Sequence, residues 1–352
     1  MDFSLFYFAN DSSEESASGR YGVLLAGARF ADRHGFAAVW TPERHFHPFG
    51  GTYPNPAVTG AAVAAVTERV AVRAGSVVAP LHHPARIAEE WSVVDNISGG
   101  RAGVSFASGW HPVDFSLRPE AFEKRKSVMA ETIEQVRALW RGEPLSVTDG
   151  VGRPAEIRTF PPPVRGELPV WVTSAGGVET FRAAGELRAG LLTHLLGQDL
   201  DELAGKITEY RASHAAATEG ERGHVVLMLH TLVGEDRERV RDAVREPMTA
   251  YLRSSFHLIA KSMPDIPADF DIDSLDPEDL DFLLERAFDR YFETGGLFGT
   301  VEDAARMVDR LRDIGVDEVA CLVDFGLPDQ QILDGLHHLA RLRETVRQGA
   351  AR

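Results

Sequence analysis

Residues 41–56, with the sequence TPERHFHPFGGTYPNP, carry more reactive side chains than a plain connecting segment needs. Glu43, Arg44, His45 and His47 stand close together and are followed by two glycines. Histidine titrates near neutral pH, so it suits proton transfer. Alternate residues of a strand share a face, so Glu43 and the two histidines could also be metal ligands. No further ligand follows at the spacing of a metal site. These residues could also contact a cofactor or form a polar loop.

Histidines and small residues recur where other apolar runs end. Small residues let a flat ligand lie against the backbone, and free amides at a helix start could bind a phosphate, although Gly176-Gly177 could be only a turn. We expect His82 and His83 at the start of a helix, and Trp110 either stacks on a cofactor or closes the top of the fold. The other candidates are His111, His194, Gly75, Ser76, Ser108, Gly109 and Ala175.

Short apolar runs alternate with longer amphipathic stretches along the chain. The runs are continuously apolar, as expected of parallel strands that are covered on both faces. Eight strand-then-helix units predict an α/β fold, a single (β/α)8 TIM barrel over residues 1–352, with function at the strand ends. The expected strands are 4–9, 36–41, 70–79, 102–108, 169–174, 190–196, 225–233 and 318–325. The expected helices are 20–34, 55–67, 84–97, 120–141, 177–187, 199–217, one from 236, and 330–347.

Two excursions interrupt this alternation, at about 142–168 and 256–300. The second contains the acidic run DFDIDSLDPEDLDF, in which Ser274 and Leu280 occupy positions where a calcium-binding EF-hand requires Gly and Glu. A solvated lid or a helix start explains this run better. The sequence contains no dinucleotide-binding G-x-G-x-x-G, P-loop, H-E-x-x-H or G-x-S-x-G pattern, which disfavours the chemistry that each supports.

Composition narrows the class of protein further. A formal net charge of -16 repels phosphate backbones and anionic lipid, so we expect no nucleic-acid or membrane partner. The single cysteine, Cys321, lies in an apolar run, which predicts a buried, inert thiol rather than a disulfide framework. No apolar run has the length of a membrane span, and the acidic N-terminal residues do not resemble a signal peptide. We therefore expect a cytoplasmic protein.

Three stretches together resemble the bacterial luciferase-like, flavin-dependent monooxygenases. They are WTPERHFHPFGGTYPNP, RAGSVVAPLHHPARIAEEWSVVDNISGGRAGVSFASGW and LPVWVTSAGGVETFRAAGE, and the similarity extends over essentially the whole chain. ASGWHPVDF, THLLGQ and EPMTAYLRSS are similar to the branch found with polyketide and nonribosomal-peptide assembly lines. The resemblance thus points to natural-product biosynthesis, on a small-molecule or carrier-protein-bound substrate.

The resemblance implies a barrel that uses reduced FMN (FMNH2) and O2. A separate flavin reductase supplies FMNH2 in that family, the oxygenating species is a flavin C4a-(hydro)peroxide, and homodimers are common. Hydroxylation, N-oxygenation and Baeyer–Villiger insertion all remain open. By position, Gly75 and Ser76 match a flavin-contacting bend that is often a cis peptide. The other residues that match flavin contacts are Ala107, Ser108 and Gly109 beside the flavin, and Ser174, Ala175, Gly176 and Gly177 in the phosphate-binding turn.

The chain departs from the luciferases at three of these positions. Arg44 stands where they have a catalytic His, and a guanidinium cannot act as a base, although it could bind an anion or hydrogen-bond a peroxide. His45 is then the first candidate for proton transfer, with Glu43 ordering the charges nearby and His194 the second candidate. Ser108 replaces an arginine that grips the FMN phosphate, and Ala107 replaces a reactive thiol, so aldehyde luminescence is not expected.

Three alternatives to an FMN-dependent monooxygenase differ from it in their chemistry. A deazaflavin (F420)-dependent hydride-transfer enzyme of the same barrel family needs no O2. A non-catalytic flavin-binding partner protein would not need the histidines and Trp110 at the strand ends. A metal-dependent barrel hydrolase would contain a bound metal ion. Cofactor titration and metal analysis distinguish these alternatives.

Overall fold

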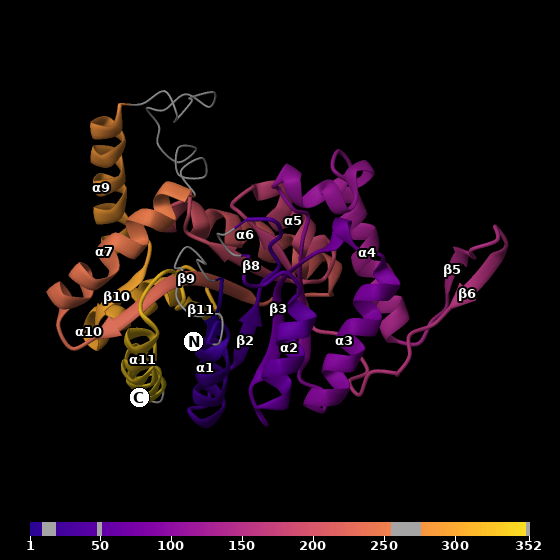
Figure 1. The fold of residues 1–352 in the computed structure, drawn as a ribbon, viewed down its shortest axis with the longest axis horizontal. Helices are drawn as coiled ribbons and strands as arrows, with labels where there is room; N and C mark the ends of the chain where they lie inside the picture. The colour runs from indigo at the N-terminus through magenta and orange to yellow at the C-terminus, as the bar shows by residue number, and fades with distance from the viewer. Residues whose placement is uncertain (9–18, 48–50, 255–275, 350–352) are drawn as a thin grey trace.

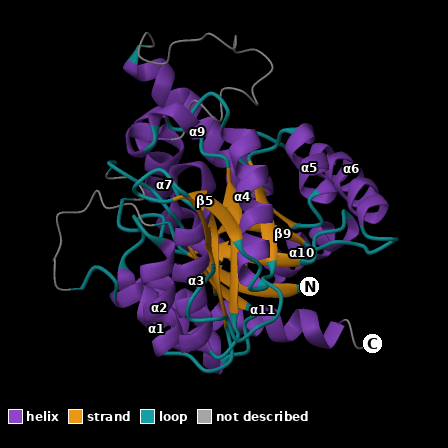
Figure 2. Cartoon of the chain, turned by 90° about the vertical axis from the view of Figure 1, so that its right-hand side faces the viewer, coloured by secondary structure: helices purple, strands orange, loops and turns teal. Residues whose placement is uncertain are grey.

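The computed structural model describes residues 1–8, 19–47, 51–254 and 276–349. Its centre is a closed barrel of eight parallel strands, surrounded by helices (Figures 1 and 2). The strands follow the order β11-β1-β2-β3-β4-β7-β8-β9, and β9 pairs with both β8 and β11 to close the ring. They are β1 (Asp2–Phe6), β2 (Ala38–Thr41), β3 (Ala71–Val78), β4 (Ala102–Ala107), β7 (Val170–Ser174), β8 (Gly190–His194), β9 (Val225–Gly234) and β11 (Glu318–Leu322).

All eight predicted strands are confirmed, which confirms the predicted TIM barrel. The strand interiors are buried almost throughout, because helices cover the outside and side chains fill the inside. Cys321 is fully buried on β11, and burial raises the pKa of its thiol to about 12, as an inert thiol requires.

Helices follow the strands at the expected places. The helix α4 begins later than predicted, because short 3-10 turns occupy 112–117 and 119–121 before it. His83 caps the start of α3 by accepting a hydrogen bond from the Ala85 amide, which confirms the expected helix start. The helices that follow the predicted units are α1 (Gly22–Arg33), α2 (Pro56–Ala65), α3 (Pro84–Ser98), α4 (Arg125–Trp140), α5 (Val178–Glu186), α6 (Leu200–Ala217), α7 (Arg237–Ser254) and α11 (Asp329–Gly349).

The amino-terminal end of the barrel is closed by a buried ion pair. Glu318 is 1% exposed and accepts two hydrogen bonds from Arg73, at 2.8 and 3.1 Å. The Arg73 guanidinium lies 5.0 Å from the ring centre of Trp40 and 4.5 Å from that of Trp171. Ser4 donates a further hydrogen bond to Glu318 at 2.6 Å. Charge pairing and aromatic packing thus hold this end together.

The first excursion is a hairpin of β5 (Leu145–Thr148) and β6 (Pro154–Ile157), which pair antiparallel. Figure 1 shows this hairpin projecting from the molecule at the end opposite to α9. It does not reach the carboxyl ends of the barrel strands, so it contributes nothing to a site there.

The second excursion contains more regular structure than the sequence analysis indicated. The helix α9 (Pro277–Thr294) begins at Asp276, whose side chain accepts a hydrogen bond from the Glu278 amide, so a helix does start in the acidic run. The strand β10 (Leu297–Thr300) pairs with the end of β9, and α10 (Val301–Asp313) follows it. The prediction that this excursion roofs the barrel rests partly on residues 255–275, which lie outside the described residues.

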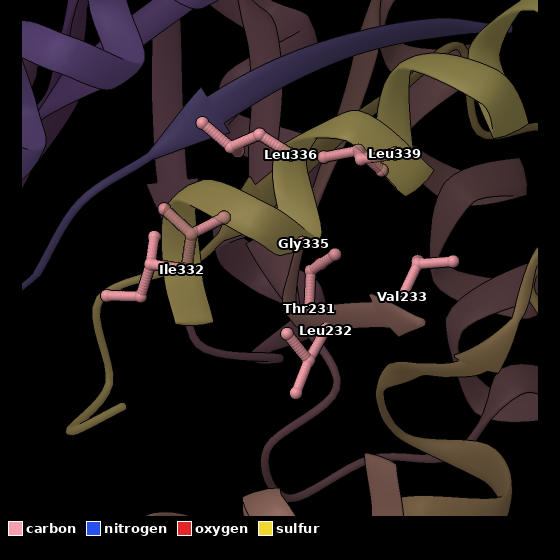
Figure 3. Close-up of a pocket in the computed structure, with 8 residues that line it drawn as sticks. Thr231, Leu232, Val233, Ile332, Gly335, Leu336 and Leu339 are labelled. Carbon is pink, nitrogen blue, oxygen red and sulfur yellow. The ribbon is translucent and has the colours of Figure 1, made fainter. Parts of the chain in front are cut away.

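Apolar packing between α11 and the end of β9 leaves a void of about 10 Å³ (Figure 3). Leu336 and Leu339 of α11 lie against the segment Thr231–Val233 in that region. A space of this size holds at most about one water molecule, so it is a packing gap rather than a ligand site. Within the described part of the chain, no helix is both long and apolar enough to cross a membrane.

Candidate active site

The structure brings the predicted site residues to one end of the barrel, which we call the mouth. Parallel strands all point the same way, so the segments that follow them meet at their carboxyl ends. The residues come from five neighbouring strands: Glu43, Arg44 and His45 after β2; Gly75 and Ser76 within β3; Ala107, Ser108, Gly109 and Trp110 at the end of β4; Ser174, Ala175, Gly176 and Gly177 after β7; and His194 at the end of β8.

A single buried carboxylate organises two histidines at the mouth. The Glu43 side chain is fully buried, and its Oε1 accepts hydrogen bonds from His45 Nε2 at 2.8 Å and from His82 Nε2 at 2.6 Å. Its Oε2 accepts the Val78 amide at 2.7 Å. His47, which the sequence offered with His45 as a possible metal ligand, is not part of this cluster. The second histidine that contacts Glu43 is His82.

Ionisation of this cluster follows from its contacts. Burial opposes the charge of Glu43, but hydrogen bonds from His45, His82 and the Val78 amide hold its pKa below the usual value. Burial likewise opposes the charge of His82, but the hydrogen bond to Glu43 and the charge of Glu43 raise the pKa of His82. Near neutral pH Glu43 is therefore an anion, and its two histidines are fixed donors at the mouth.

An irregularity in β3 places small and hydroxyl side chains beside this cluster. The pairing with β4 shifts register between Gly75 and Val77, and the Gly75-Ser76 peptide is cis, as the family resemblance implies. A Cβ at Gly75 would lie 2.6 Å from the Phe6 ring, so only glycine fits. Ser76 hydrogen-bonds to Thr173, which also bonds Ser105 at 2.7 Å.

The loop after β4 carries Trp110 across the mouth. Gly109 has φ +75°, a backbone conformation that favours glycine, and a Cβ there would lie 2.8 Å from Phe115. Trp110 is 50% exposed, and the Arg44 guanidinium lies over its ring at 4.9 Å from the ring centre. In this structure Trp110 thus stacks on a cation of the chain itself.

The turn after β7 offers backbone amides to a ligand. Gly176 has φ +111°, and Gly177 precedes α5 without any side chain capping the first amides of the helix. The buried Ser174 accepts a hydrogen bond from the Gly176 amide at 3.3 Å. Uncapped amides at a helix start suit a phosphate group.

Two neutral histidines lie on the other side of the mouth. Burial lowers the pKa of His194 to about 4 and that of His230, on β9, to about 3. The Leu196 amide donates to Nδ1 of His194 at 3.1 Å, so Nε2 carries its proton. His230 Nδ1 hydrogen-bonds to the Tyr291 hydroxyl at 3.0 Å, and its ring lies 4.1 Å from that of Tyr251.

The sequence analysis did not select His82, His230, Tyr251 or Tyr291 as site residues. His230 had a usable signal, because it lies within an apolar strand, as His194 does. The two tyrosines had none, since they lie on α7 and α9, far along the chain from the strands they cover. Among the described residues, no group of three His, Cys, Asp or Glu side chains is arranged to hold a metal ion.

The closed barrel and its mouth define a TIM-barrel protein with a carboxylate–histidine cluster and the uncapped amides of a helix start at one end. Residues 1–345 match the family described as luciferase-like monooxygenases, and the chain belongs to that family. The oxygenase component of flavin-dependent trigonelline monooxygenase from Acinetobacter baylyi is 25% identical over 256 residues, covering 71% of this chain and 70% of that protein. An alkanal monooxygenase alpha chain from Photorhabdus luminescens is 34% identical over 117 residues, 33% of this chain and 32% of that one.

Solved structures share the fold at lower identity. Monooxygenase RslO1 from Streptomyces bottropensis has a TM-score of 0.75 at 22% identity, covering 97% of this chain and 98% of its own. The oxygenating constituent of 3,6-diketocamphane monooxygenase from Pseudomonas putida is a type II Baeyer–Villiger enzyme in complex with FMN. Its TM-score is 0.75 at 18% identity, and the match covers 97% of each of the two chains. An F420-dependent secondary alcohol dehydrogenase has a TM-score of 0.71 at 16% identity, and the match covers 98% of each of the two chains.

The residues at the mouth fit a flavin phosphate ester. Gly75 carries no side chain at the β3 irregularity, and the uncapped start of α5 provides amides that suit a phosphate. Both features suit FMN and deazaflavin alike, since each has a flat ring system and a phosphate.

Proposed function

We propose that this protein is an FMNH2- and O2-dependent monooxygenase. The observation that carries the proposal is the Glu43 cluster, in which a buried carboxylate fixes His45 and His82 next to the β3 irregularity. A passive flavin-binding partner has less need of such groups, whereas a hydride-transfer enzyme would also need a proton acceptor, so the oxygen-mixing experiment below separates the two enzymes. Bound FMNH2 supplies the electrons that activate O2, and the protein supplies orientation, protons and exclusion of water.

We assign proton transfer to His45. Its side chain is 12% exposed, so it can meet a ligand at the mouth, whereas Glu43 behind it is fully buried. Glu43 holds the imidazole through Nε2 and acts as a positioning residue. His82, paired with the same oxygen, keeps the cluster close to electrically neutral when it is protonated.

His194 would act as a fixed hydrogen-bond donor rather than as an acid. Its pKa of about 4 keeps it neutral at physiological pH, and the Leu196 amide fixes the tautomer with the proton on Nε2. The charged Arg44 is a separate group that cannot take up a proton.

The proposal also includes a class of substrate and a partner protein. The resemblance of ASGWHPVDF, THLLGQ and EPMTAYLRSS supports a natural-product substrate, free or bound to a carrier protein. The similarity to an oxygenase component supports a separate flavin reductase. Hydroxylation, N-oxygenation and Baeyer–Villiger insertion are the candidate reactions.

We further propose a homodimer through α2 and α3. Val58, Val93 and Ile97 are 67%, 43% and 48% exposed on the outer faces of these helices. A hollow of about 440 Å³ lies between the helices, lined in part by Val58, Val93 and Phe160. Apolar groups gathered in this way favour a protein contact.

Rapid mixing tests the function. The protein is loaded with FMNH2 without oxygen and mixed with oxygenated buffer, and absorbance is followed. We expect flavin oxidation to be slower than that of free FMNH2 and to proceed through a separate phase. Oxidation identical to that of free FMNH2, with tight binding of F420 in a parallel titration, would instead support the deazaflavin alternative.

The same experiment tests His45. We expect His45→Ala to bind FMN with unchanged affinity but to release more hydrogen peroxide per flavin oxidised, because the proton donor is missing. His47→Ala serves as the matched control, since His47 lies outside the Glu43 cluster. Equal peroxide yields from the two variants would remove His45 from the proposed role.

A further inference from the structure

Arg44 is a buried cation without a counter-ion. Its residue is 6% exposed, and its Nε atom has no hydrogen-bond partner. Among the described residues, no carboxylate oxygen lies within 4.0 Å of its guanidinium nitrogens. Burying one ion costs several kcal/mol unless another charge compensates it. A ligand is therefore the natural source of that compensation.

The other arginine inside this barrel shows how the fold normally neutralises such a group. Arg73 at the opposite end donates two hydrogen bonds to the buried Glu318. It also lies between two tryptophan rings. Arg44 has the aromatic contact, over Trp110, but lacks the carboxylate.

The Arg44 guanidinium lies beside Trp110, at the mouth, and within the electrostatic influence of Asp114. The stack on Trp110 fixes the plane of the guanidinium. Asp114 contributes an attractive charge, but its Oδ1 lies 3.4 Å from His111 Nδ1. Among the described residues, neither of these two atoms has a hydrogen-bond partner. Burial lowers the pKa of Arg44, which Asp114 and Tyr251 partly oppose, yet a guanidinium stays charged at working pH.

We propose that Arg44 binds a carboxylate group of the substrate. A planar carboxylate can accept two parallel hydrogen bonds from a guanidinium edge. The charge of nearby Asp114 disfavours a dianion, so a carboxylate suits this position better than a phosphate. The inference rests on the proposed function, since it names the class of substrate that this active site accepts.

The flavin phosphate is expected elsewhere. The amides proposed to bind it lie at the start of α5, which follows β7, whereas Arg44 follows β2. In the sheet, β3 and β4 separate β2 from β7. Arg44 is thus placed to bind a second anion on the other side of the mouth.

A binding titration without flavin tests the proposal. Benzoate is the probe and benzamide its uncharged isostere, and tryptophan fluorescence is the signal. Trp110 is the tryptophan at the mouth, since the other four, Trp40, Trp91, Trp140 and Trp171, are at most 6% exposed. We expect benzoate to bind the wild-type protein at least about tenfold more tightly than benzamide, a difference of about 1.4 kcal/mol. Trp110→Phe assigns the signal.

Variants decide the role of Arg44. Arg44→Gln should abolish the preference for benzoate, and Arg44→Lys should keep part of it, because a charge remains but the planar fork is lost. Arg125→Gln is the matched control, since Arg125 also stacks on an aromatic ring, Phe122 at 4.6 Å, but does not contact Trp110. Urea unfolding of each variant confirms that it is folded.

Three outcomes would overturn the proposal. They are equal affinities for benzoate and benzamide in the wild-type protein, an unchanged preference in a folded Arg44→Gln variant, and tighter binding of phenyl phosphate than of benzoate. A loss of FMN affinity in Arg44→Gln without a change in riboflavin affinity would assign Arg44 to the flavin phosphate instead. Failure of the oxygen-mixing experiment concerns the proposed function alone, because the benzoate and benzamide titrations contain no flavin.

Discussion

At the scale of single residues, Glu43 shows what a sequence can and cannot indicate. The spacing of Glu43, Arg44 and His45 after a strand predicted a group at the mouth, and the structure places them there. The partner His82 was not predictable in that role, because the loop after β3 brings it across and nothing local requires the contact. Likewise, Arg44 turns to Trp110 rather than to Glu43, which depends on tertiary packing.

The Glu43 cluster predicts a stability that depends on pH. The lowered pKa of Glu43 makes its contribution complete above its usual value of 4.5 and lost as pH falls below it. The raised pKa of His82 makes its contribution complete below its usual value of 6.5 and lost as pH rises above it. Glu43→Gln should therefore lower the free energy of unfolding by roughly 2 kcal/mol between these pH values, and by less outside them.

Urea unfolding at a series of pH values measures this difference. Glu120→Gln is the control, because Glu120 is exposed and its ion pair with Arg118 lies at the surface, so its effect should be much smaller and should vary little with pH. A Glu43→Gln difference that is constant from pH 4 to pH 8 would show that Glu43 and His82 do not act as a charged pair.

At the scale of elements, continuous apolar runs identified all eight barrel strands, since a strand covered on both faces has few polar positions. The region after residue 256 was read as an excursion because β10 has only four residues. The helix α10 had a signal that was overlooked: Thr300 and Asp303 form a capping box at its start. The β5–β6 hairpin is exposed and short, and its Pro/Gly-rich sequence indicates no strand.

The helix α5 yields a prediction in which stability and binding change in opposite directions. Gly177 is the N-cap residue, and a Cβ there meets only Thr180, at 3.8 Å. Gly177→Asp should cap the helix and raise stability by roughly a few tenths of a kcal/mol. The same carboxylate would occupy the amides and repel a phosphate, so FMN should bind at least about tenfold more weakly.

Riboflavin, which lacks the phosphate, gives the decisive comparison, and its affinity should be unchanged. Gly177→Ser is the matched variant, since it can cap the helix without adding a charge. Calorimetric or fluorescence titrations with both flavins measure the ratio of affinities. An equal loss for FMN and riboflavin would mean that the phosphate does not lie at this turn.

At the scale of the whole molecule, the two ends of the barrel use charge differently. The amino-terminal end contains a complete pair, Arg73 with Glu318. The mouth contains an anion shared by two histidines and, within the described residues, a cation that forms no ion pair with a carboxylate. Stability in such barrels is concentrated at the first end and function at the second. Mutations at the two ends should therefore separate stability from binding.

Glu318→Gln is the test of that separation. The variant keeps a hydrogen-bond acceptor for Ser4 but leaves the Arg73 guanidinium buried without an opposite charge. Burial by itself would raise the pKa of Glu318, yet Arg73 and His224 hold it below the usual value, so the carboxylate is charged in the wild-type protein. Removing one member of a buried pair costs about 3–5 kcal/mol, and we expect a loss of that size in urea unfolding.

The double variant Arg73→Met with Glu318→Gln should recover part of that loss, because the unpaired buried charge is removed as well. FMN and benzoate affinities, measured where both variants are fully folded, should remain those of the wild-type protein, since neither residue lies at the mouth. A fall in these affinities without a fall in unfolding free energy would show that the amino-terminal end shapes the site, and that stability and binding are not separated along the barrel axis.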